Sequence, residues 1–415
     1  MLYNAYEMQK SMLAGASAMA DFSAGWLSNP ANPLSYLGGG TVLASALEVF
    51  AHAAAPRGKP AFGLNRTIID GKEVAVEEEI VLRKPFGQLK RFKRKGMTGG
   101  PKLLIVAPMS GHYATLLRGT VERMLPVADV YITDWRDAKQ VPLSDGTFDL
   151  DDYVDYVIEF LDTIGKGGDG DAKGKRPHML AVCQPSVPCY AAACVMSADK
   201  HPHRPATLTM MGGPVDTREA PTAVNTLATE RPHSWFSQNV IATIPATYPG
   251  AGRRVYPGFL QLAGFMSMNL GNHMMSHYEM FKHLVQGDED SADLSKDFYE
   301  EYRSVCDMTA EFYLQTIDVV FQNHALPKGT MQHRGRTVDP AAITDIGILA
   351  IEGEKDDISG LGQTKAALTI ATKLPAAKKK YYMAEGAGHY GIFNGSRWRD
   401  KIAPVVVKWM ADNAA

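Results

Sequence analysis

Short apolar runs alternate with longer amphipathic stretches through the middle of the chain. Runs rich in β-branched and apolar residues predict strands at 74–83, 102–109, 129–135, 178–183, 206–213 and 347–354. Helical spacing of apolar positions predicts helices at 112–126, 151–164 and 186–199, between the strands. Strands that alternate with helices of this length form a mostly parallel sheet flanked by helices, so the pattern predicts an α/β fold.

The regular alternation stops after the strand at 206–213. The chain then runs through a long stretch rich in aromatic residues and methionine, and an ordered segment of this size needs secondary structure of its own. We therefore expect a large, mainly helical cap or lid. The predicted division of the chain is an N-terminal helical segment at 1–70, a core at 71–216, the cap at 217–342 and the rest of the core at 343–415.

The first segment has an amphipathic pattern of its own. Its apolar positions are Leu2, Tyr3, Tyr6, Met12, Leu13, Met19, Phe22 and Trp26. Such a face either docks on the main domain or lies on a lipid-like surface. The sequence leaves both interpretations open.

Composition and charge narrow the class of protein. The 415 residues are 45% hydrophobic and carry a formal net charge of −2, which fits a globular protein and gives no overall positive field for nucleic acid. The basic run at 90–95 is interpreted as a solvated strand or turn face. Four cysteines without zinc or CxxC spacing indicate reduced thiols and a cytoplasmic location. We expect no signal peptide and no transmembrane segment.

The stretch "HMLAVCQPSVPC" is typical of a strand, a tight turn and the start of a helix, which is where a hydrolase carries its nucleophile. Centred on Cys183, the turn has the compact neighbours Ala181 and Pro185 and directly follows the strand. Centred on Ser186, it starts three residues after the strand has ended. The spacing favours Cys183 as the nucleophile, with Ser186 in the first helical turn.

Two later strands end next to an acid and a histidine. In an α/β-hydrolase the order along the chain is nucleophile, acid, base. "LAIEGEKDDISG" offers Asp356, with Asp357 and the earlier Asp216 as alternatives, and "GAGHYGIF" offers His389 as the base. We therefore predict an α/β-hydrolase fold with Cys183, Asp356 and His389 as catalytic residues.

This assignment points to other site residues. The oxyanion hole needs two backbone N–H groups, and we expect one from Gln184 and the other from Met109 or Ser110. His112 either lines the pocket or starts a helix. "HMMSH", with His273 and His277, lacks a third ligand, so no metal is predicted, and the mechanism needs no cofactor.

The segments "AVCQPSVP", "GEKDDISG" and "GAGHYGIFNG", together with "MMGGPVDTR", resemble the intracellular poly(3-hydroxybutyrate) (PHB) depolymerases, which are distant relatives of polyhydroxyalkanoate synthases. The resemblance implies a cysteine nucleophile at Cys183, the acid Asp356, the base His389, and an amorphous polyester in intracellular granules as substrate. Aromatic cap residues such as Trp235 and Phe236, and Tyr390 beside the base, are candidates for substrate contacts. The granule surface is the expected partner, and a homo-oligomer is compatible with the sequence.

Three other functions are also compatible with these sequence segments. A polyhydroxyalkanoate synthase would carry Gly-Gly where Pro185 and Ser186 stand. A small-molecule thioesterase or acyltransferase and a non-catalytic granule-coating protein are the other two. A cysteine acyl-enzyme is a thioester, so the sequence also suggests thiolysis with CoA as a partner of the reaction.

Overall fold

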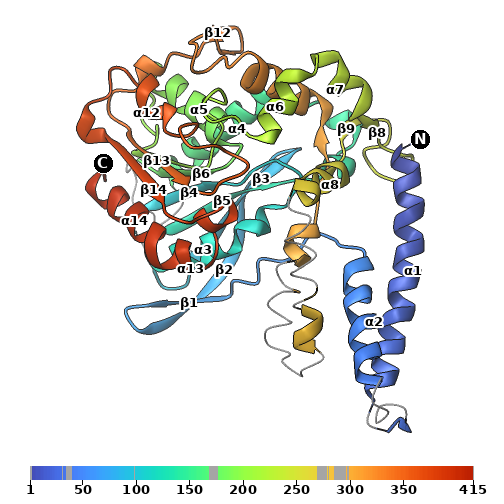
Figure 1. The fold of residues 1–415 in the computed structure, drawn as a ribbon. Helices are drawn as coiled ribbons and strands as arrows, with labels where there is room; N and C mark the ends of the chain where they lie inside the picture. Colours follow the sequence, from blue (N-terminus) through green and yellow to red (C-terminus); the bar gives the residue numbers. More distant parts are fainter. Residues whose placement is uncertain are drawn as a thin grey trace.

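The computed structural model describes residues 2–29, 31–33, 40–97, 99–167, 176–268, 278, 280–284, 296 and 299–414. Its centre is a nine-stranded sheet within this described part, with the strand order β1-β2-β3-β5-β4-β6-β7-β13-β14 (Figure 1). The strands are β1 (Arg66–Ile69), β2 (Lys72–Arg83), β3 (Gly87–Arg94), β4 (Lys102–Val106), β5 (Asp129–Trp135), β6 (His178–Val182), β7 (Thr207–Met211), β13 (Gly347–Gly353) and β14 (Lys379–Ala384). The six strands β5, β4, β6, β7, β13 and β14 pair in parallel with one another. Strands β1, β2 and β3 extend the sheet beyond β5 by antiparallel pairing.

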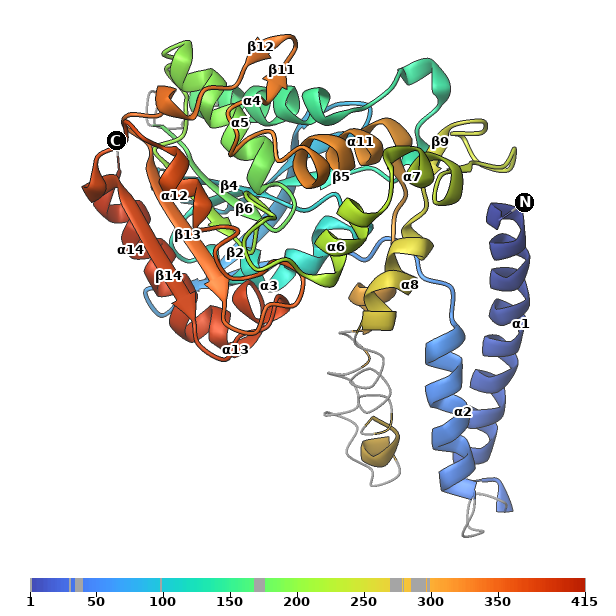
Figure 2. The same ribbon diagram turned by 45° about the horizontal axis from the view of Figure 1, so that its top comes forward.

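Helices cover both faces of the sheet. They are α3 (Arg118–Met124), α4 (Leu150–Lys166), α5 (Ser186–Ala198), α12 (Ala366–Ile370), α13 (Gly395–Arg397) and α14 (Ala403–Asp412). Figures 1 and 2 show α4 and α5 on one face, with α3 and α14 on the other. Every residue of β4, β6, β7 and β13 is buried, because helices shield both sides of these strands. This explains why their sequences are nearly continuous apolar runs.

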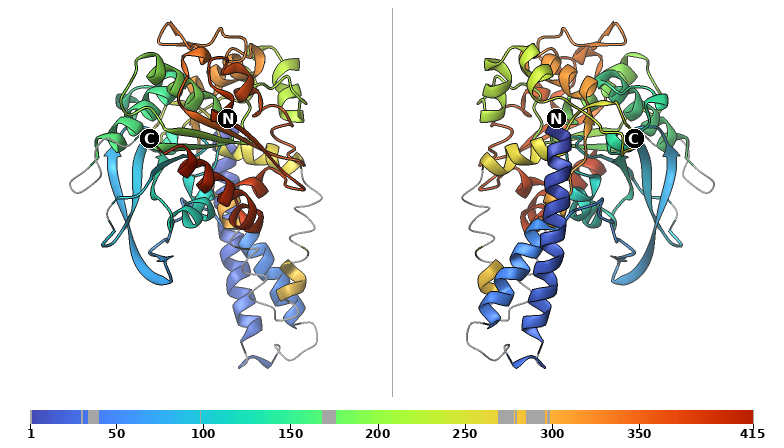
Figure 3. Two further views of the ribbon diagram at one scale, coloured as in Figure 1. Left: turned by 90° about the vertical axis from the view of Figure 1, so that its left-hand side faces the viewer. Right: turned by 90° about the vertical axis from the view of Figure 1, so that its right-hand side faces the viewer.

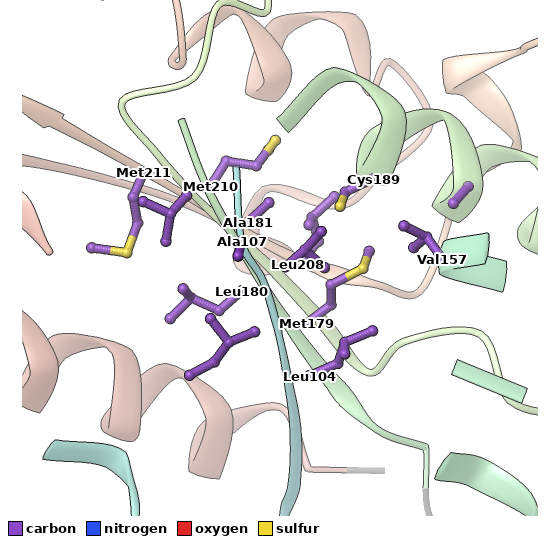
Figure 4. Close-up of a cluster of buried hydrophobic side chains, with 14 of the residues drawn as sticks. Leu104, Ala107, Val157, Met179, Leu180, Ala181, Cys189, Leu208, Met210 and Met211 are labelled. Carbon is purple, nitrogen blue, oxygen red and sulfur yellow. The ribbon is translucent and has the colours of Figure 1, made fainter. Parts of the chain in front are cut away.

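The core is packed from the central strands and the helix that follows the proposed nucleophile. Figure 4 shows the side chains of Leu104, Met179 and Leu208 together on the face of the sheet that packs against α5, with Leu180 on the opposite face. The sulfur of Cys189 from α5 lies among them and is fully buried. All four cysteines are free thiols, as the sequence predicts.

The segment between β7 and β13 contains more than helices. Its elements are α6 (Ala223–Glu230), α7 (His233–Asn239), β8 (Ala242–Thr243), β9 (Arg254–Tyr256), α8 (Gly258–Met268), β10 (Met308–Thr309), α11 (Ala310–Thr316), the π-helical turn η5 (Ile317–Gln322), β11 (Gln332–His333) and β12 (Arg336–Thr337). Strands β8, β9 and β10 form a small antiparallel sheet, and β11 and β12 form a hairpin. These very short strands cannot be predicted from the sequence because none has room for an alternating pattern.

The N-terminal segment forms a helical hairpin of α1 (Leu2–Ser28) and α2 (Gly40–Ala54). Figures 1 and 3 show the hairpin projecting from the body as an arm, with α1 on its outer side. The Ser17 hydroxyl donates to the carbonyl of Ala51 at 2.7 Å, which joins the two helices. Among the described residues, no helix is both long enough and apolar enough to cross a membrane.

The predicted α/β-hydrolase fold is confirmed by the parallel sheet and by the ends of its strands. All six strands predicted from apolar runs are present, within a few residues of the expected bounds. The basic run at 90–95 forms most of β3, where Lys90 pairs with Glu78 at 2.7 Å and Arg91 pairs with Asp129 at 2.9 Å. Lys90 and Arg91 therefore form ion pairs within the sheet, while Lys93 and Lys95 are exposed to solvent.

Candidate active site

Cys183 occupies a sharp turn between β6 and α5. Its φ angle is +66°, in the left-handed region that few residues other than glycine adopt. The Cys183 N–H donates to the Met211 carbonyl at 2.7 Å, and its own carbonyl accepts from the Ser186 N–H at 3.1 Å. These bonds hold the strained residue at the carboxyl end of the central strands, next to the first turn of a 13-residue helix. The geometry is that of a nucleophile elbow.

Ser186 lies in a different environment. Its side chain is fully buried, and its hydroxyl has no hydrogen-bond partner among the described residues. A Cβ built on Gly213 would lie 1.9 Å from the Ser186 Oγ, which shows how closely that backbone covers the hydroxyl. Cys183 is partly exposed and lines the main cavity. Of the two candidates, only Cys183 is accessible to a substrate.

His389 and Asp356 meet across the ends of β13 and β14. The His389 Nδ1 lies 2.8 Å from the Asp356 Oδ2, and both side chains are almost completely buried. The other carboxylate oxygen of Asp356 accepts the N–H groups of Ile358 at 2.9 Å and Ser359 at 2.8 Å. With Nδ1 engaged, the Nε2 of His389 is the ring nitrogen left for Cys183, and the interaction with Cys183 is among the causes that raise the pKa of His389.

The alternative acids lie elsewhere. Asp216 forms an ion pair with Arg218 at 2.7 Å, which occupies both of its oxygens. Asp357 is exposed. Asp356 is therefore the carboxylate that the structure brings to His389.

The electrostatics of the site favour a charged imidazole. Burial alone would lower the pKa of His389, but the negative charges of Cys183 and Asp356, and hydrogen bonds to both, raise this pKa well above its ordinary value. This direction favours a protonated imidazole at His389. A protonated imidazole in this position holds a proton ready for a leaving group.

The expected oxyanion donors lie beside Cys183, with one difference. The Met109 N–H donates to the side-chain Oε1 of Gln184 at 3.2 Å, which ties the loop after β4 to the nucleophile turn. Within the described residues, the backbone N–H groups of Gln184 and Ser110 have no hydrogen-bond partner. Gln184 and Ser110 are thus the free pair of donors, and Met109 belongs to the link that positions them.

Cys183 opens into an apolar cavity of about 360 Å³. Its floor comes from the ends of the strands, and its walls come from the segment inserted after β7. The insertion contributes side chains from α6, α7, β9, α8, α11 and η5. Tyr256 and Tyr313 stack with ring centroids 4.0 Å apart and form part of one wall. An apolar cleft with a few polar groups at the nucleophile suits an ester of low polarity.

The four residues expected to contact substrate have different surroundings. Phe236 lines the cavity. Trp235 packs edge-on against Phe236 instead of facing the cavity. The His112 ring is buried, and its Nε2 lies 2.9 Å from the Tyr302 carbonyl. Burial lowers the pKa of His112 to about 4, which keeps it neutral. Tyr390 packs edge-on against the His389 ring at 5.8 Å and supports it from the side. Of these four residues, Phe236 alone is in the cavity wall.

Gly212 is a site residue that the sequence did not single out. It follows β7 with a φ of +60° and lines the cavity. A Cβ there would lie 3.1 Å from both the His389 Cε1 and the Asp356 Oδ2. The signal in the sequence was the Gly-Gly pair that ends the "MMGG" strand, since paired glycines after a strand mark a close approach.

A possible metal-ligating group lies away from this site. Among the described residues, Asp162, His201 and His203 have ligand atoms within 4.8 Å of one another. Asp162 lies near the end of α4, and the two histidines precede β7. The group is therefore near the amino ends of the parallel strands, whereas Cys183 lies at their carboxyl ends. The Lys166 ammonium already pairs with Asp162 at 2.5 Å. His273 and His277 lie outside the described residues.

Comparison with known proteins gives one sequence match and many distant structural ones. Residues 212–414 match the family described as PHB de-polymerase C-terminus. No curated protein matches the chain by sequence. Similar solved structures include DcsB in complex with its substrate analogue (14% identity, TM-score 0.47, covering 82% of this chain and 99% of that one). An esterase from Thermogutta terrifontis (13%, 0.42, 85% and 98%) and a monoacylglycerol lipase from Paleococcus ferrophilus (12%, 0.42, 76% and 97%) are others. At TM-scores this low, the fold assignment rests on the sheet order and strand ends described above.

Proposed function

We propose that the chain is a carboxylic ester hydrolase of the PHB depolymerase family, whose C-terminal model matches residues 212–414, and that it hydrolyses amorphous PHB through Cys183, His389 and Asp356. The observation that carries the proposal is the placement of Cys183. It stands in a left-handed turn at the base of an apolar cavity, with the buried His389–Asp356 pair beside it. The proposed location is the cytoplasm, at the surface of PHB granules.

The proposed reaction has two steps. The Cys183 thiolate attacks an ester carbonyl, and the oxyanion accepts hydrogen bonds from the N–H groups of Gln184 and Ser110. As the intermediate collapses, the alcohol end of the polymer leaves with the proton of His389. Water then attacks the thioester while His389 takes its proton. This releases the acid and restores the thiolate, with Asp356 orienting the imidazole throughout.

The inserted segment at 217–342 is proposed to act as the cap that selects the polymer. Its side chains form most of the cavity wall and are largely apolar, so they exclude water from the thioester and accept an uncharged chain. Trp235 is proposed to support this wall through Phe236, because it contacts that ring.

The test is incubation of the purified protein with amorphous PHB granules, with soluble 3-hydroxybutyrate as the readout. The wild type and Ser186→Ala should release it, because the Ser186 hydroxyl is buried and has no partner among the described residues. Cys183→Ala should release none while retaining its circular dichroism spectrum. An inactive Ser186→Ala with an active Cys183→Ala would reverse the choice of nucleophile. Polymer growth from hydroxybutyryl-CoA would identify a synthase, and granule binding without product would identify a coat protein.

Thiolysis is a second outcome that cysteine itself favours. The acyl-Cys183 intermediate is a thioester, so its transfer to the thiol of CoA is nearly thermoneutral, whereas a serine ester would face an uphill step. The enzyme would then release 3-hydroxybutyryl-CoA beside the free acid. Granules, enzyme and millimolar CoA, followed by mass spectrometry, test this. Free acid as the sole product at that CoA concentration would show that the enzyme hydrolyses the thioester and does not transfer it to CoA.

A further inference from the structure

Helix α1 presents its largest apolar side chains to solvent. We name as the α1 stripe the residues Met8, Met12, Met19, Phe22 and Trp26. Their exposed fractions lie between 52% and 76%. Because successive helical residues turn by about 100°, the five fall within about 80° of the helix circumference and run for about 27 Å.

The opposite face of α1 is built from small side chains. Ser17, Ala20 and Ala24 are buried there, and Ser17 bonds to α2. The helix therefore buries small residues against its neighbour and exposes its Met, Phe and Trp residues. This reverses the usual arrangement, in which the larger apolar face is buried. In Figure 3, α1 forms the outer side of the arm, away from the body. An exposed stripe of this length indicates contact with an apolar phase.

The start of α1 connects the arm to the cavity wall. The Tyr3 hydroxyl donates to the Asp307 carboxylate at 2.6 Å, and the Tyr6 ring stacks on Phe259 of α8 at 3.9 Å. Two other residues of α8, Gln261 and Gly264, line the cavity. Helix α1 is thus connected, through α8, to the wall of the cavity that Cys183 also lines.

We propose that the α1 stripe is the element by which the enzyme adsorbs to its amorphous polyester substrate, an inference that rests on the proposed function. The absence of charge on the stripe favours this occupant. Residues 2–54 contain one lysine against one aspartate and two glutamates, so the hairpin has no basic cluster to recruit an anionic membrane. A polyester is uncharged, as is the stripe, and Trp26 adds an N–H donor suited to ester carbonyls.

The side-chain types also favour an irregular surface over a second copy of the chain. A helical dimer seam carries β-branched residues and leucine at regular positions. The stripe has three methionines, whose flexible side chains adapt to uneven surfaces, and Gly15 lies within it with no atom near its Cβ position. Such a face has the adaptability that a disordered polymer requires.

The test compares two matched triple variants with the wild type. The stripe variant carries Met12→Gln, Met19→Gln and Phe22→Gln, which keep good helix formers on α1. The control variant carries Ile68→Gln, Val81→Gln and Met97→Gln, three exposed apolar residues of the body. Adsorption to protein-free amorphous PHB granules is measured by sedimentation, and turnover of a soluble butyrate ester reports the catalytic site.

We expect the stripe variant to partition at least tenfold less onto granules, because burial of even one such side chain is worth about a factor of ten. The control should adsorb as the wild type does, and both variants should turn over the soluble ester. Unchanged adsorption of the stripe variant would refute the proposal. A wild-type dimer that the stripe substitutions dissociate would make the stripe a copy interface. Equal wild-type binding to neutral phosphatidylcholine vesicles, lost in the variant, would make it a membrane contact. Stripe-dependent adsorption without 3-hydroxybutyrate release would instead reject the proposed function alone.

Discussion

Replacing Gly212 by alanine would press on two proposed catalytic side chains at once. The new Cβ would lie 3.1 Å from the His389 Cε1, 3.1 Å from the Asp356 Oδ2 and 2.8 Å from the Ile392 Cδ1. The Ile392 methyl can turn away, since it ends a flexible side chain. The His389–Asp356 pair is buried and hydrogen-bonded, so it has to shift by a few tenths of an ångström.

Gly63 provides a control for the backbone part of this change. Its φ is +64°, close to the +60° of Gly212, but a Cβ there would meet no atom within 4 Å. Alanine at either position costs about 1 kcal/mol of stability, because the left-handed conformation crowds its Cβ. Only Gly212→Ala also moves the catalytic pair. A misplacement of about 1 Å can cost roughly a hundredfold in rate, so a smaller shift should cost about tenfold, or ~1.4 kcal/mol of transition-state stabilisation.

The assay is kcat/KM on a soluble short-chain ester, with urea unfolding of the same samples. We expect both alanine variants to lose similar stability and only Gly212→Ala to lose activity. Wild-type kcat/KM in Gly212→Ala would show that the pair tolerates the contact and would refute the reasoning. An equal loss of activity in Gly63→Ala would assign the effect to stability.

The same geometry gives three further expected outcomes. Asp356→Asn should lose about 10⁴-fold in kcat, as when a triad acid is removed, while Asp357→Asn should have little effect; the reverse order of severity would reassign the acid. In Asp356→Asn the pKa of His389, followed by NMR titration, should fall, because one of the charges that raise it is gone; an unchanged pKa contradicts the assignment. A raised pKa of His389 stabilises the folded protein, fully so below the unfolded-state pKa of about 6.5. This stabilisation is lost as the pH rises through the pKa of His389 in the folded protein. Because that pKa is lower in Asp356→Asn, the variant should lose the stabilisation at a lower pH than the wild type. Gln184→Ala should lower kcat about tenfold with little change in KM, because the Met109 N–H loses its bond to the nucleophile turn. Gln184→Glu keeps an acceptor for that N–H and should retain most activity. Faster turnover by Gln184→Ala would show that the Gln184 side chain obstructs the oxyanion site.

The parts of the site that were predictable from sequence are those fixed by a single strand end. Cys183, Asp356 and His389 each stand within about five residues of the end of a strand, and parallel strands bring their carboxyl ends to one side of the sheet. Position along the chain was therefore enough to expect them together. The choice of Cys183 over Ser186 depended on where the strand ends, and burial of Ser186 agrees with that choice.

Contacts between distant segments could not be predicted in this way. The bond from Met109 to Gln184 spans 75 positions, and His112 turns to a carbonyl 190 positions away. Both residues stand near the predicted site in sequence, but side-chain direction is decided by packing partners that no local pattern identifies. Trp235 shows the same limit, since an aromatic residue in a cap can line the cavity or support the residue that does.

Helix α1 shows why an amphipathic pattern alone did not decide between docking and surface contact. The apolar residues interpreted as one face belong to two. Tyr3 and Tyr6 pack on the body through Asp307 and Phe259, whereas Met12, Met19, Phe22 and Trp26 face solvent. Docking on the body is therefore observed for Tyr3 and Tyr6, whereas contact of the exposed residues with an apolar surface stays a prediction. The pattern could not separate them because the buried side of the hairpin uses alanine and serine, which a hydrophobicity scale does not mark as a core face. Here the size of the side chains, and not their polarity, distinguishes the face that packs from the face that is left free to bind.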